Sequence, residues 1–585
     1  MRVFLDLMWF FRAHKREYIS GVFFLIVVSV IGLIPPMVVG RAVNRMVQHT
    51  MTAPVLAAYM AIIFVTAVLS YGLRYLWRLR LYGGSVRLAS VLRDRLYGHF
   101  TRLSPEFYLG HRIGDLMAHS TNDVQAIQET AGDGVLMMVD SLVSGATVIT
   151  TMAVGISGKL TLISLLPLPI MAVVISHYGR LLHERFTLAQ EAFSDINDRV
   201  QEYISGIRIV RAFGQERWER ESFVELSRDV VQKNVAVAQI VSLFDPTISV
   251  IIGFSYFLAI AFGALLVVHR TINVGNLTTF TLYLGQLIWP MMAFGFLFNV
   301  VERGSASYDR VQTLLNIDPQ VVDRDEALDV VPSGAVVFDV PTFRYPHTRP
   351  TVLADIRLTV PRGSTLGIVG RTGSGKTTLL RLLLREFDLE TGDIRIGDVS
   401  IYDVRLDSLR AAIAYAPQDD FLFSMTIRDN LAFQRPDASN SEVERVARMA
   451  GIHDDIMDFP QAYDTLVGER GVTLSGGQKQ RVSIARALLA EAEILLLDDT
   501  LSAVDARTEA AILMQLKQNR AGRTTFIATH RLSGVEHADQ IIVLEHGRIV
   551  EQGTHPDLIE LGGRYADMFE RQQLENLVEQ GGSGK

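Results

Sequence analysis

Six long apolar stretches fill the first half of this 585-residue chain, and they constrain its fold more than any other feature. About 20 uncharged residues in a helix are enough to cross roughly 30 Å of hydrocarbon. The sequence therefore predicts six membrane-spanning helices, at residues 18–39, 51–73, 137–158, 160–178, 246–268 and 274–301. Hydrophobic residues make up 49% of the chain and charged residues only 20%, which is unusual for a wholly soluble protein of this size.

The gaps between these stretches alternate between short and long, which defines two sides of a membrane. The long gap after the second stretch begins with Arg74, Arg78 and Arg80, and basic residues beside a span favour the cytoplasmic face. Both long gaps, residues 74–133 and 178–245, are predicted to be cytoplasmic. Their apolar residues keep a helical period, so the spanning helices are predicted to continue into the cytosol.

The N-terminus adds a further membrane-associated segment. Apolar residues over 3–11, followed by Arg12, Lys15 and Arg16, predict a helix lying on the membrane surface, with a frayed terminus as the alternative. The stretch 18–39 exceeds the usual length of a cleaved signal sequence, so it is predicted to be retained as the first span.

Two acidic residues, Asp140 and Asp245, lie at the cytoplasmic edges of apolar stretches. A carboxylate at membrane depth is costly, and such residues are often functional. If the helices extend into the cytosol, both carboxylates face water at the headgroup level instead. The sequence leaves both interpretations open.

Net charge and cysteine content exclude several classes of function. The 56 Lys and Arg residues against 63 Asp and Glu residues give a net charge of −7, so nucleic acid is not predicted as a partner. The chain has no cysteine, which excludes disulfides, thiol catalysis and cysteine-ligated metal centres.

The composition changes after the last apolar stretch, at residue 317. Residues 318–334 are rich in aspartate, proline and glycine, and they predict a solvated linker between a membrane domain over residues 1–317 and a second domain. Over residues 335–575, apolar β-branched runs alternate with helical patterns, which is typical of an α/β domain with a largely parallel sheet. Residues 576–585 are predicted to be a flexible tail.

A phosphate-binding motif lies near the start of this α/β domain. Residues 370–377 match the P-loop pattern, and they directly follow a predicted strand and precede a predicted helix. Glycines let backbone N–H groups surround phosphate oxygens, Lys376 reaches the phosphates, and the Thr377 hydroxyl ligates Mg²⁺. Asp498, at the end of an apolar strand, supplies a second magnesium ligand. The predicted ATP-binding residues here are Gly370, Arg371, Thr372, Gly373, Ser374, Gly375, Lys376, Thr377 and Thr378.

A five-residue segment between these two motifs, Leu474–Gln478, reads LSGGQ and opens a predicted helix. With this segment the chain resembles an ATP-binding-cassette (ABC) exporter half-transporter of the type IV fold over residues 1–575. The resemblance implies an all-α membrane domain of six helices with long intracellular extensions, followed by an α/β P-loop nucleotide-binding domain. It also implies that Ser475, Gly476, Gly477 and Gln478 contact phosphate across an interface, as a helix N-terminus can.

The resemblance assigns roles to further residues. Tyr345 resembles the aromatic residue that stacks on adenine, with a core tyrosine as the alternative. Gln418 resembles the residue that contacts Mg²⁺ and the attacking water, and His530 resembles the switch histidine at the γ-phosphate. The other matched segments are the exporter loop at Glu469, the interface loop Ser502–Asp505, and two coupling segments at residues 114–121 and 212–216.

One residue departs from the family pattern. Asp499 occupies the position where such transporters usually carry the glutamate that polarises the attacking water. Its side chain is one methylene shorter, and retreating by roughly 1.5 Å can take a base out of reach of its proton. The chain is therefore predicted to bind ATP and Mg²⁺ but to hydrolyse ATP poorly at its own site; a tolerated exchange with nearly normal turnover is the alternative.

These features together resemble the bacterial heterodimeric multidrug exporters. The resemblance implies ATP-driven export of amphipathic drug-like or lipid-like compounds across the cytoplasmic membrane by alternating access, with a different half-transporter chain supplying the catalytic glutamate. A homodimeric lipid or peptide exporter and an ATP-binding membrane sensor or regulatory subunit are the alternatives. Aromatic residues of the last two spans, which suit an apolar cavity or plain helix packing, are Phe254, Tyr256, Phe257, Phe294, Phe296 and Phe298.

Overall fold

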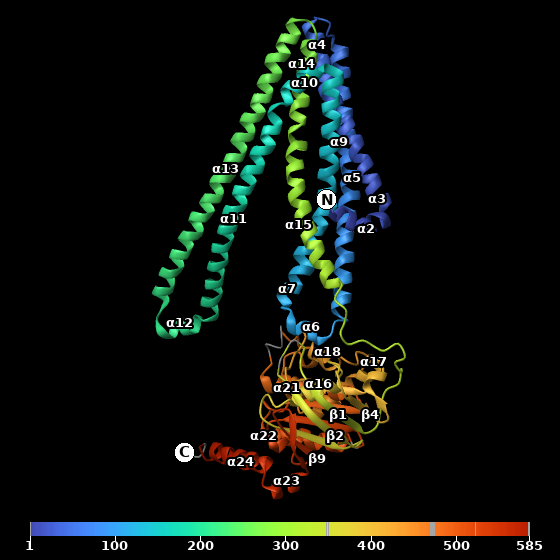
Figure 1. Ribbon diagram of the computed structural model, residues 1–585, viewed down its shortest axis with the longest axis vertical. Coiled ribbons are helices and arrows are strands. Elements are labelled where there is room, and N and C mark those ends of the chain that lie inside the picture. Colours follow the sequence, from blue (N-terminus) through green and yellow to red (C-terminus); the bar gives the residue numbers. More distant parts are fainter. Residues whose placement is uncertain (1, 347, 349, 469–473, 521, 583–585) are drawn as a thin grey trace. The chain divides into compact units, whose positions relative to one another are not determined.

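The computed structural model describes residues 2–582, except residues 347, 349, 469–473 and 521. It divides into two compact units. The helical unit comprises Met1–Thr101 and Ile113–Ile317, and the α/β unit comprises Arg102–Arg112 and Asp318–Lys585. Figure 1 labels the elements of both units.

The helical unit is built from long helices (Figure 1). Its main elements are α3 (Lys15–Ile31), α4 (Ile34–Val47), α5 (Ala53–Phe100), α9 (Val135–Met152), α10 (Gly158–Leu165), α11 (Pro167–Ser205), α13 (Glu216–Val268), α14 (Val274–Gln286) and α15 (Ile288–Leu315). Shorter helical segments connect them: α1 (Arg2–Asp6), α2 (Met8–Ala13), α7 (Ile113–Ala118), η1 (His119–Asp123), α8 (Val124–Glu129), η2 (Thr130–Gly134), η3 (Ala153–Ser157) and α12 (Ile207–Phe213).

Five helical stretches of the described residues are long and apolar enough to cross a membrane: Lys15–Val47, Ala53–Phe100, Ile113–Ser205, Glu216–Val268 and Val274–Leu315. The third contains both the third and the fourth predicted spans. Its helix is interrupted at Ser157, where the backbone is extended (φ −165°, ψ 119°) and the side chain caps α10 by accepting the N–H of Leu160. Two passes therefore meet at Ser157, and Lys159, where the turn was expected, lies inside α10.

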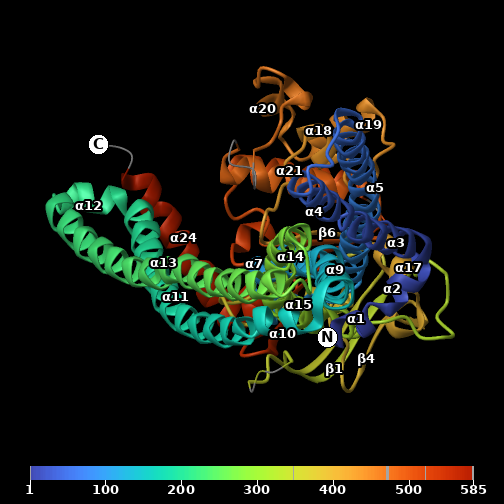
Figure 2. The ribbon, with the colours of Figure 1, turned by 90° about the horizontal axis from the view of Figure 1, so that it is seen from above.

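The long helices continue beyond the apolar stretches, as predicted. Helix α13 has 53 residues and is roughly 80 Å long at 1.5 Å per residue, far more than a bilayer core requires. Helices α11 and α13 pack side by side and are joined by α12, so they form a hairpin (Figures 1 and 2). The N-terminal segment forms α1 and α2, and Val3 of α1, Leu7 between the two helices and Phe10 of α2 are buried.

The α/β unit contains two sheets. The four-stranded sheet has the order β2-β1-β4-β5, and the six-stranded sheet has the order β10-β9-β3-β8-β7-β6. The strands are β1 (Val336–Phe343), β2 (Leu353–Val360), β3 (Thr365–Val369), β4 (Asp393–Ile396), β5 (Val399–Ser400), β6 (Ile413–Ala416), β7 (Ile494–Asp498), β8 (Thr524–Thr529), β9 (Gln540–Glu545) and β10 (Arg548–Gly553). All neighbours in the larger sheet are parallel except β10, so five carboxyl ends share one edge.

Helices surround both sheets of the α/β unit. They are α6 (Pro105–Gly110), α16 (Lys376–Leu383), α17 (Leu406–Ala411), α18 (Ile427–Leu431), α19 (Asn440–Met449), α20 (His453–Met457), α21 (Gly476–Leu489), α22 (Ala506–Asn519), α23 (His555–Leu561) and α24 (Arg564–Gly582). Short 3₁₀ turns lie at Ile401–Asp403, Ala462–Asp464 and Leu532–Gly534.

One segment differs from the sequence-based expectations: the predicted tail is helical as far as Gly582, where α24 ends. The predicted coupling segments 114–121 and 212–216 belong to the helical unit, and Arg102–Arg112 clusters with the α/β unit. Most residues of the linker are exposed, and Asp323 also accepts the backbone N–H of Leu406 (2.7 Å).

Candidate functional site

Asp498 is fixed at the carboxyl edge of the large sheet by two hydrogen bonds. The Thr377 hydroxyl donates to Asp498 Oδ1 (3.0 Å), and the Tyr415 hydroxyl donates to Oδ2 (3.2 Å). Burial raises the pKa of Asp498, while these two hydrogen bonds and the charge of Arg381 oppose that rise. The structure thus brings two predicted magnesium ligands, Thr377 and Asp498, together.

The loop between β3 and α16 needs glycine at particular positions. Gly370 and Gly375 have φ of +156° and +104°. A Cβ on Gly370 would lie 2.3 Å from the carbonyl oxygen of Leu544, and one on Gly375 would lie 2.6 Å from Cδ2 of Leu353. A side chain at Gly370 would therefore clash with the backbone of β9, and one at Gly375 would be strained by the positive φ even if Leu353 moved.

The Lys376 ammonium group closes this loop. Its Nζ donates to the carbonyl oxygens of Gly370 (2.8 Å) and Arg371 (3.2 Å). Burial lowers the pKa of Lys376, and the carboxylates of Asp499 and Asp498 oppose that shift. A cation held next to a ring of backbone N–H groups suits the phosphates of a nucleotide.

Asp499 and His530 form a direct pair beside this loop. The His530 Nδ1–H donates to Asp499 Oδ1 at 2.8 Å. The Asp499 side chain is 19% exposed, and its backbone has φ of +53° with the N–H bonded to the carbonyl oxygen of Ala528 (2.8 Å). The predicted base position is thus already engaged by the predicted switch histidine.

The LSGGQ segment has a separate local structure. Ser475 caps α21 and forms a capping box with Gln478, in which each side chain bonds the other residue's backbone N–H (3.3 and 3.0 Å). Gln480 accepts the backbone N–H of Ala503 (2.8 Å) and donates to the Ser502 hydroxyl (3.1 Å). Helix α21, which begins within this segment, is therefore fixed to the predicted interface loop.

Some predicted residues are not brought to the Thr377–Asp498 pair. Within the described ranges, neither Gln418, which is exposed after β6, nor the side chains of Ser475 and Gln478 form a hydrogen bond with that pair. Gly476 and Gly477 lie with Ser475 at the start of α21. Glu469 lies outside the described residues.

Tyr345 lies directly after β1 and is half-buried. Its hydroxyl shares a hydrogen bond with that of Thr378 (2.9 Å), and its ring meets the rings of Phe343 and Phe387 edge-on, with centroids 5.3 and 5.1 Å away. These contacts hold the ring next to the start of α16, the helix that follows the glycine-rich loop.

The donor set suits Mg²⁺ better than a metal with many protein ligands. Among the described residues, no group of three or more His, Cys, Asp or Glu side chains is arranged to hold a metal ion. Mg²⁺ usually takes one or two carboxylates and completes its shell with water and substrate phosphates. The Asp498 carboxylate and the Thr377 hydroxyl fit that pattern.

The sequence analysis missed Tyr415 as a partner of Asp498. Tyr415 lies on β6, which pairs with β7 so that Tyr415 is opposite Leu496. Burial raises the pKa of Tyr415, and the charge of Asp498 raises it further, so its hydroxyl stays protonated and donating. An aromatic residue near a strand end is ordinary in a core, so only the strand order could reveal this contact.

The acidic and aromatic residues of the helical unit are spread over its helices. Asp140 accepts the Ser144 hydroxyl (2.8 Å), which also bonds the Ser29 hydroxyl (2.8 Å), whereas Asp245 is exposed. Phe254 and Phe257 stack with centroids 6.1 Å apart and line an apolar cavity of about 440 Å³ between α11 and α13.

Comparisons with known proteins agree with this architecture. Residues 18–291 match the family model described as ABC transporter transmembrane region, and residues 353–502 match the one described as ABC transporter. The chain is 46% identical to "Probable multidrug resistance ABC transporter ATP-binding/permease protein YheI" of Bacillus subtilis (strain 168), over 98% of both chains. It is 48% identical to "Multidrug resistance-like ATP-binding protein MdlA" of Escherichia coli (strain K12), over 99% of this chain and 98% of the relative.

More distant relatives extend the comparison. The "ATP-dependent lipid A-core flippase" of Syntrophus aciditrophicus (strain SB) is 33% identical over 84% of this chain and 82% of its own length. A solved structure described as a bacterial Atm1-family ABC exporter with ATP bound matches with a TM-score of 0.80 and 28% identity, over 95% of this chain and 99% of that one.

Proposed function

Because this chain belongs to the ABC transporter family, as an exporter with a membrane domain and a cytosolic nucleotide-binding domain in the plasma membrane, we propose that it exports amphipathic drug-like or lipid-like compounds as one subunit of a heterodimer. We further propose that its own ATP site hydrolyses ATP weakly. ATP hydrolysis coupled to export is the activity of the family. The heterodimeric partner and the weakened ATP site are our proposals.

The glycine-rich loop is the proposed ATP site of this chain. Residues 370–378 surround the phosphates, Lys376 neutralises their charge, and Tyr345 packs against adenine. The Thr377 hydroxyl and the Asp498 carboxylate hold Mg²⁺, which when bound neutralises phosphate charge, and Gln418 completes its shell. The hydrogen bond between Thr377 and Asp498 supports this assignment.

The pair of Asp499 and His530 is the observation that carries the proposal of a weakened site. A base must lie within hydrogen-bond reach of the proton that it takes. The Asp499 side chain is one methylene shorter than glutamate and its Oδ1 is already bonded to His530 Nδ1 (2.8 Å). The attacking water in this site therefore lacks a well-placed base, whereas Ser475, Gly476, Gly477 and Gln478 remain able to complete the site of a partner chain.

Exposed apolar side chains at the end of the α11–α13 hairpin support the need for a partner. Ile209, Phe213 and Trp218 are 65%, 74% and 58% exposed, and they lie outside the predicted spans. Apolar patches of this kind in water usually mark an interaction surface. A second half-transporter is the proposed occupant of this surface.

The substrate class rests on the relatives and on the apolar surface of the helical unit. Two of the relatives carry multidrug resistance in their descriptions, and a third is described as a lipid flippase. The cavity beside Phe254 and Phe257 is lined by apolar residues, which suits the apolar part of an amphipathic molecule.

Flux measurements test the transport function. The chain, alone and with a catalytically competent half-transporter from the same cell, is reconstituted into proteoliposomes and ATP-dependent uptake of a fluorescent amphipath is followed. The proposal expects ATP-dependent uptake by the mixed sample, and it expects the Lys376→Ala variant to lower that uptake. ATP binding without uptake in either sample would favour a sensor, and full uptake by the chain alone would favour a homodimer.

A further inference from the structure

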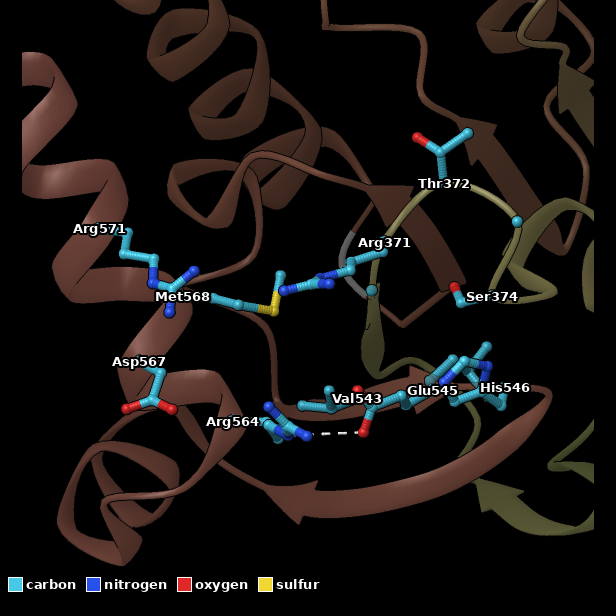
Figure 3. A pocket seen from close by; sticks show the side chains of 13 residues that line it. Arg371, Thr372, Ser374, Val543, Glu545, His546, Arg564, Asp567, Met568 and Arg571 are labelled. Carbon is cyan, nitrogen blue, oxygen red and sulfur yellow. Dashed lines mark ion pairs between the residues drawn. The ribbon is translucent and has the colours of Figure 1, made fainter.

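A cavity of about 190 Å³ lies between the glycine-rich loop and the C-terminal helix α24. Figure 3 shows the side chains around it. The residues that matter for its chemistry are Arg371, Ser374, Glu545, Arg564, Asp567 and Arg571. Residues 370–374 of the glycine-rich loop form one wall, so the cavity adjoins the proposed ATP site, but the magnesium ligands Thr377 and Asp498 do not line it and neither does Lys376.

The cavity has an excess of positive charge. Three guanidinium groups and two carboxylates line it. Arg564 is paired with Glu545 at 3.5 Å, whereas no carboxylate of the described residues lies within 4.0 Å of Arg371 or Arg571. In Figure 3 the carboxylate of Asp567 points away from Arg371. Two unpaired guanidinium groups beside one cavity favour an anionic ligand.

A buried hydroxyl in the same lining lacks a partner. Ser374 is 5% exposed, and its Oγ forms no hydrogen bond with the described residues. Buried polar groups are nearly always hydrogen-bonded, so an isolated one calls for an unseen partner. The hydroxyl can donate to an anion oxygen at the wall opposite α24.

Helix α24 is held firmly, and it is connected to the switch histidine. Tyr565 is fully buried and its hydroxyl bonds His555 Nδ1 (2.8 Å). Gln572 donates to the carbonyl oxygen of His530 (2.6 Å) and accepts the N–H of Leu532 (2.9 Å). An occupant of the cavity would therefore touch the glycine-rich loop on one side and the helix that contacts His530 on the other.

We propose that this cavity is a second anion site, which binds a tetrahedral phosphate group between the glycine-rich loop and α24, next to ATP. Its volume is below the roughly 300–1,000 Å³ of pockets for drug-sized ligands, which favours a small oxyanion over a nucleotide. Arg371 and Arg571 hold the anion by charge-assisted hydrogen bonds, and Ser374 donates a third. Bound phosphate connects the glycine-rich loop to α24 and so stabilises the position of His530.

The test titrates inorganic phosphate against the full chain in lipid nanodiscs. Magnesium and a non-hydrolysable ATP analogue are kept saturating, so that the proposed ATP site is filled. The midpoint of thermal unfolding is measured in potassium phosphate and in potassium chloride of equal ionic strength. Wild type is expected to show saturable stabilisation, and Arg571→Ala is expected to raise the half-saturating phosphate concentration at least tenfold.

Two variants separate the site from general charge effects. Arg548→Ala removes an exposed arginine of β10 that does not line the cavity, so it is expected to titrate like wild type. Arg571→Lys keeps the charge and is expected to retain part of the affinity, which shows that α24 still docks. Glucose 6-phosphate in place of phosphate shows whether the site takes a phosphate ester or only the free ion.

Equal phosphate titrations for wild type, Arg571→Ala and Arg548→Ala would overturn the proposal, as would the absence of any stabilisation beyond that in chloride. This readout does not depend on transport or on ATP hydrolysis. A negative phosphate titration therefore does not bear on the proposed export function. A negative flux measurement likewise does not change how the titration is interpreted.

Discussion

The α/β unit and the helical unit differ in how they hold the residues proposed for function. In the α/β unit, Thr377 and His530 bond Asp498 and Asp499 at 3.0 and 2.8 Å, at the ends of buried strands. In the helical unit, Phe254 and Phe257 are 53% and 62% exposed on a broad apolar surface. Chemistry on a small rigid substrate needs fixed atoms, whereas transport of varied amphipaths tolerates distributed contacts. Single substitutions should therefore have large effects in the first region and small ones in the second.

The largest effect is expected at Lys376. Replacing it with alanine removes the cation that faces the phosphates of ATP bound to this chain, and a hydrogen bond to a charged group typically contributes about 1.5–3 kcal/mol. Lys376→Ala is therefore expected to weaken the binding of Mg-ATP to the chain purified alone at least tenfold, measured with a fluorescent ATP analogue. A loss of affinity of less than about twofold would contradict the assigned role.

A packing prediction sharpens the comparison from within the helical unit. A Cβ on Gly40 of α4 would lie 1.8 Å from the Thr279 hydroxyl and 2.4 Å from the Gly275 carbonyl oxygen. Gly40→Ala is therefore expected to destabilise the unit by about 1–3 kcal/mol. Gly253→Ala is the matched control because nothing lies within 4 Å of the added Cβ. The midpoints of thermal unfolding of the two variants are compared in nanodiscs. Equal midpoints would show that α4 and α14 can move apart enough to accommodate the added methyl group.

A pH prediction concerns Asp420 in the α/β unit. Burial raises its pKa to about 7, with a further contribution from Asp419. The folded state then holds a proton that the unfolded state releases near pH 4, so stability falls as pH rises from about 4 to about 7. After discounting for partial exposure, the loss is about 1–2 kcal/mol at pH 8 relative to pH 4.

The matched pair Asp420→Asn and Asp419→Asn checks this assignment. Asp420→Asn removes the titrating group and is expected to flatten the dependence of unfolding free energy on pH. Asp419 is exposed, so Asp419→Asn should keep most of the slope. Parallel pH profiles for wild type and Asp420→Asn would show that another group is responsible.

The smallest effect is expected from Phe254. Phe254→Ala removes one of several apolar side chains beside the α11–α13 cavity. The amphipath concentration that gives half-maximal stimulation of ATP hydrolysis should therefore change no more than about threefold. A change above about 30-fold would show that this surface recognises substrate through one residue, which would remove the contrast between the two units.

Much of the α/β site could be predicted from the sequence because its motifs are local. The glycine spacing at residues 370–375 predicts the phosphate-binding loop, and the apolar run before Asp498 predicts the strand that positions its carboxylate, without knowledge of the rest of the fold. The contact of Tyr415 with Asp498 depends on which strands become neighbours, and no local pattern encodes that. Gln418 is identified by its motif, yet it is exposed, and among the described residues it forms no hydrogen bond with Thr377.

The helical unit was predictable in its apolar stretches and less so in its turns. The third and fourth spans meet at Ser157 because its side chain caps the next helix, a detail that a single lysine at 159 obscured. The aspartates of residues 318–334 are expected to be solvated, and the side chain of Asp329 is 71% exposed although it also accepts the Ser408 hydroxyl (2.6 Å). The composition of the segment indicates its exposure but does not reveal which acidic residues bond the domain.

The central claim is that Asp499 disables the ATP site of this chain and makes a partner necessary. Steady-state ATP hydrolysis of the chain purified alone in lipid, compared with Asp499→Glu, tests it most directly. The proposed weakened site predicts near-background turnover for wild type and restored turnover for Asp499→Glu, with Lys376→Ala as the inactive control. Wild-type turnover equal to that of Asp499→Glu would contradict it and would make a homodimer the better description.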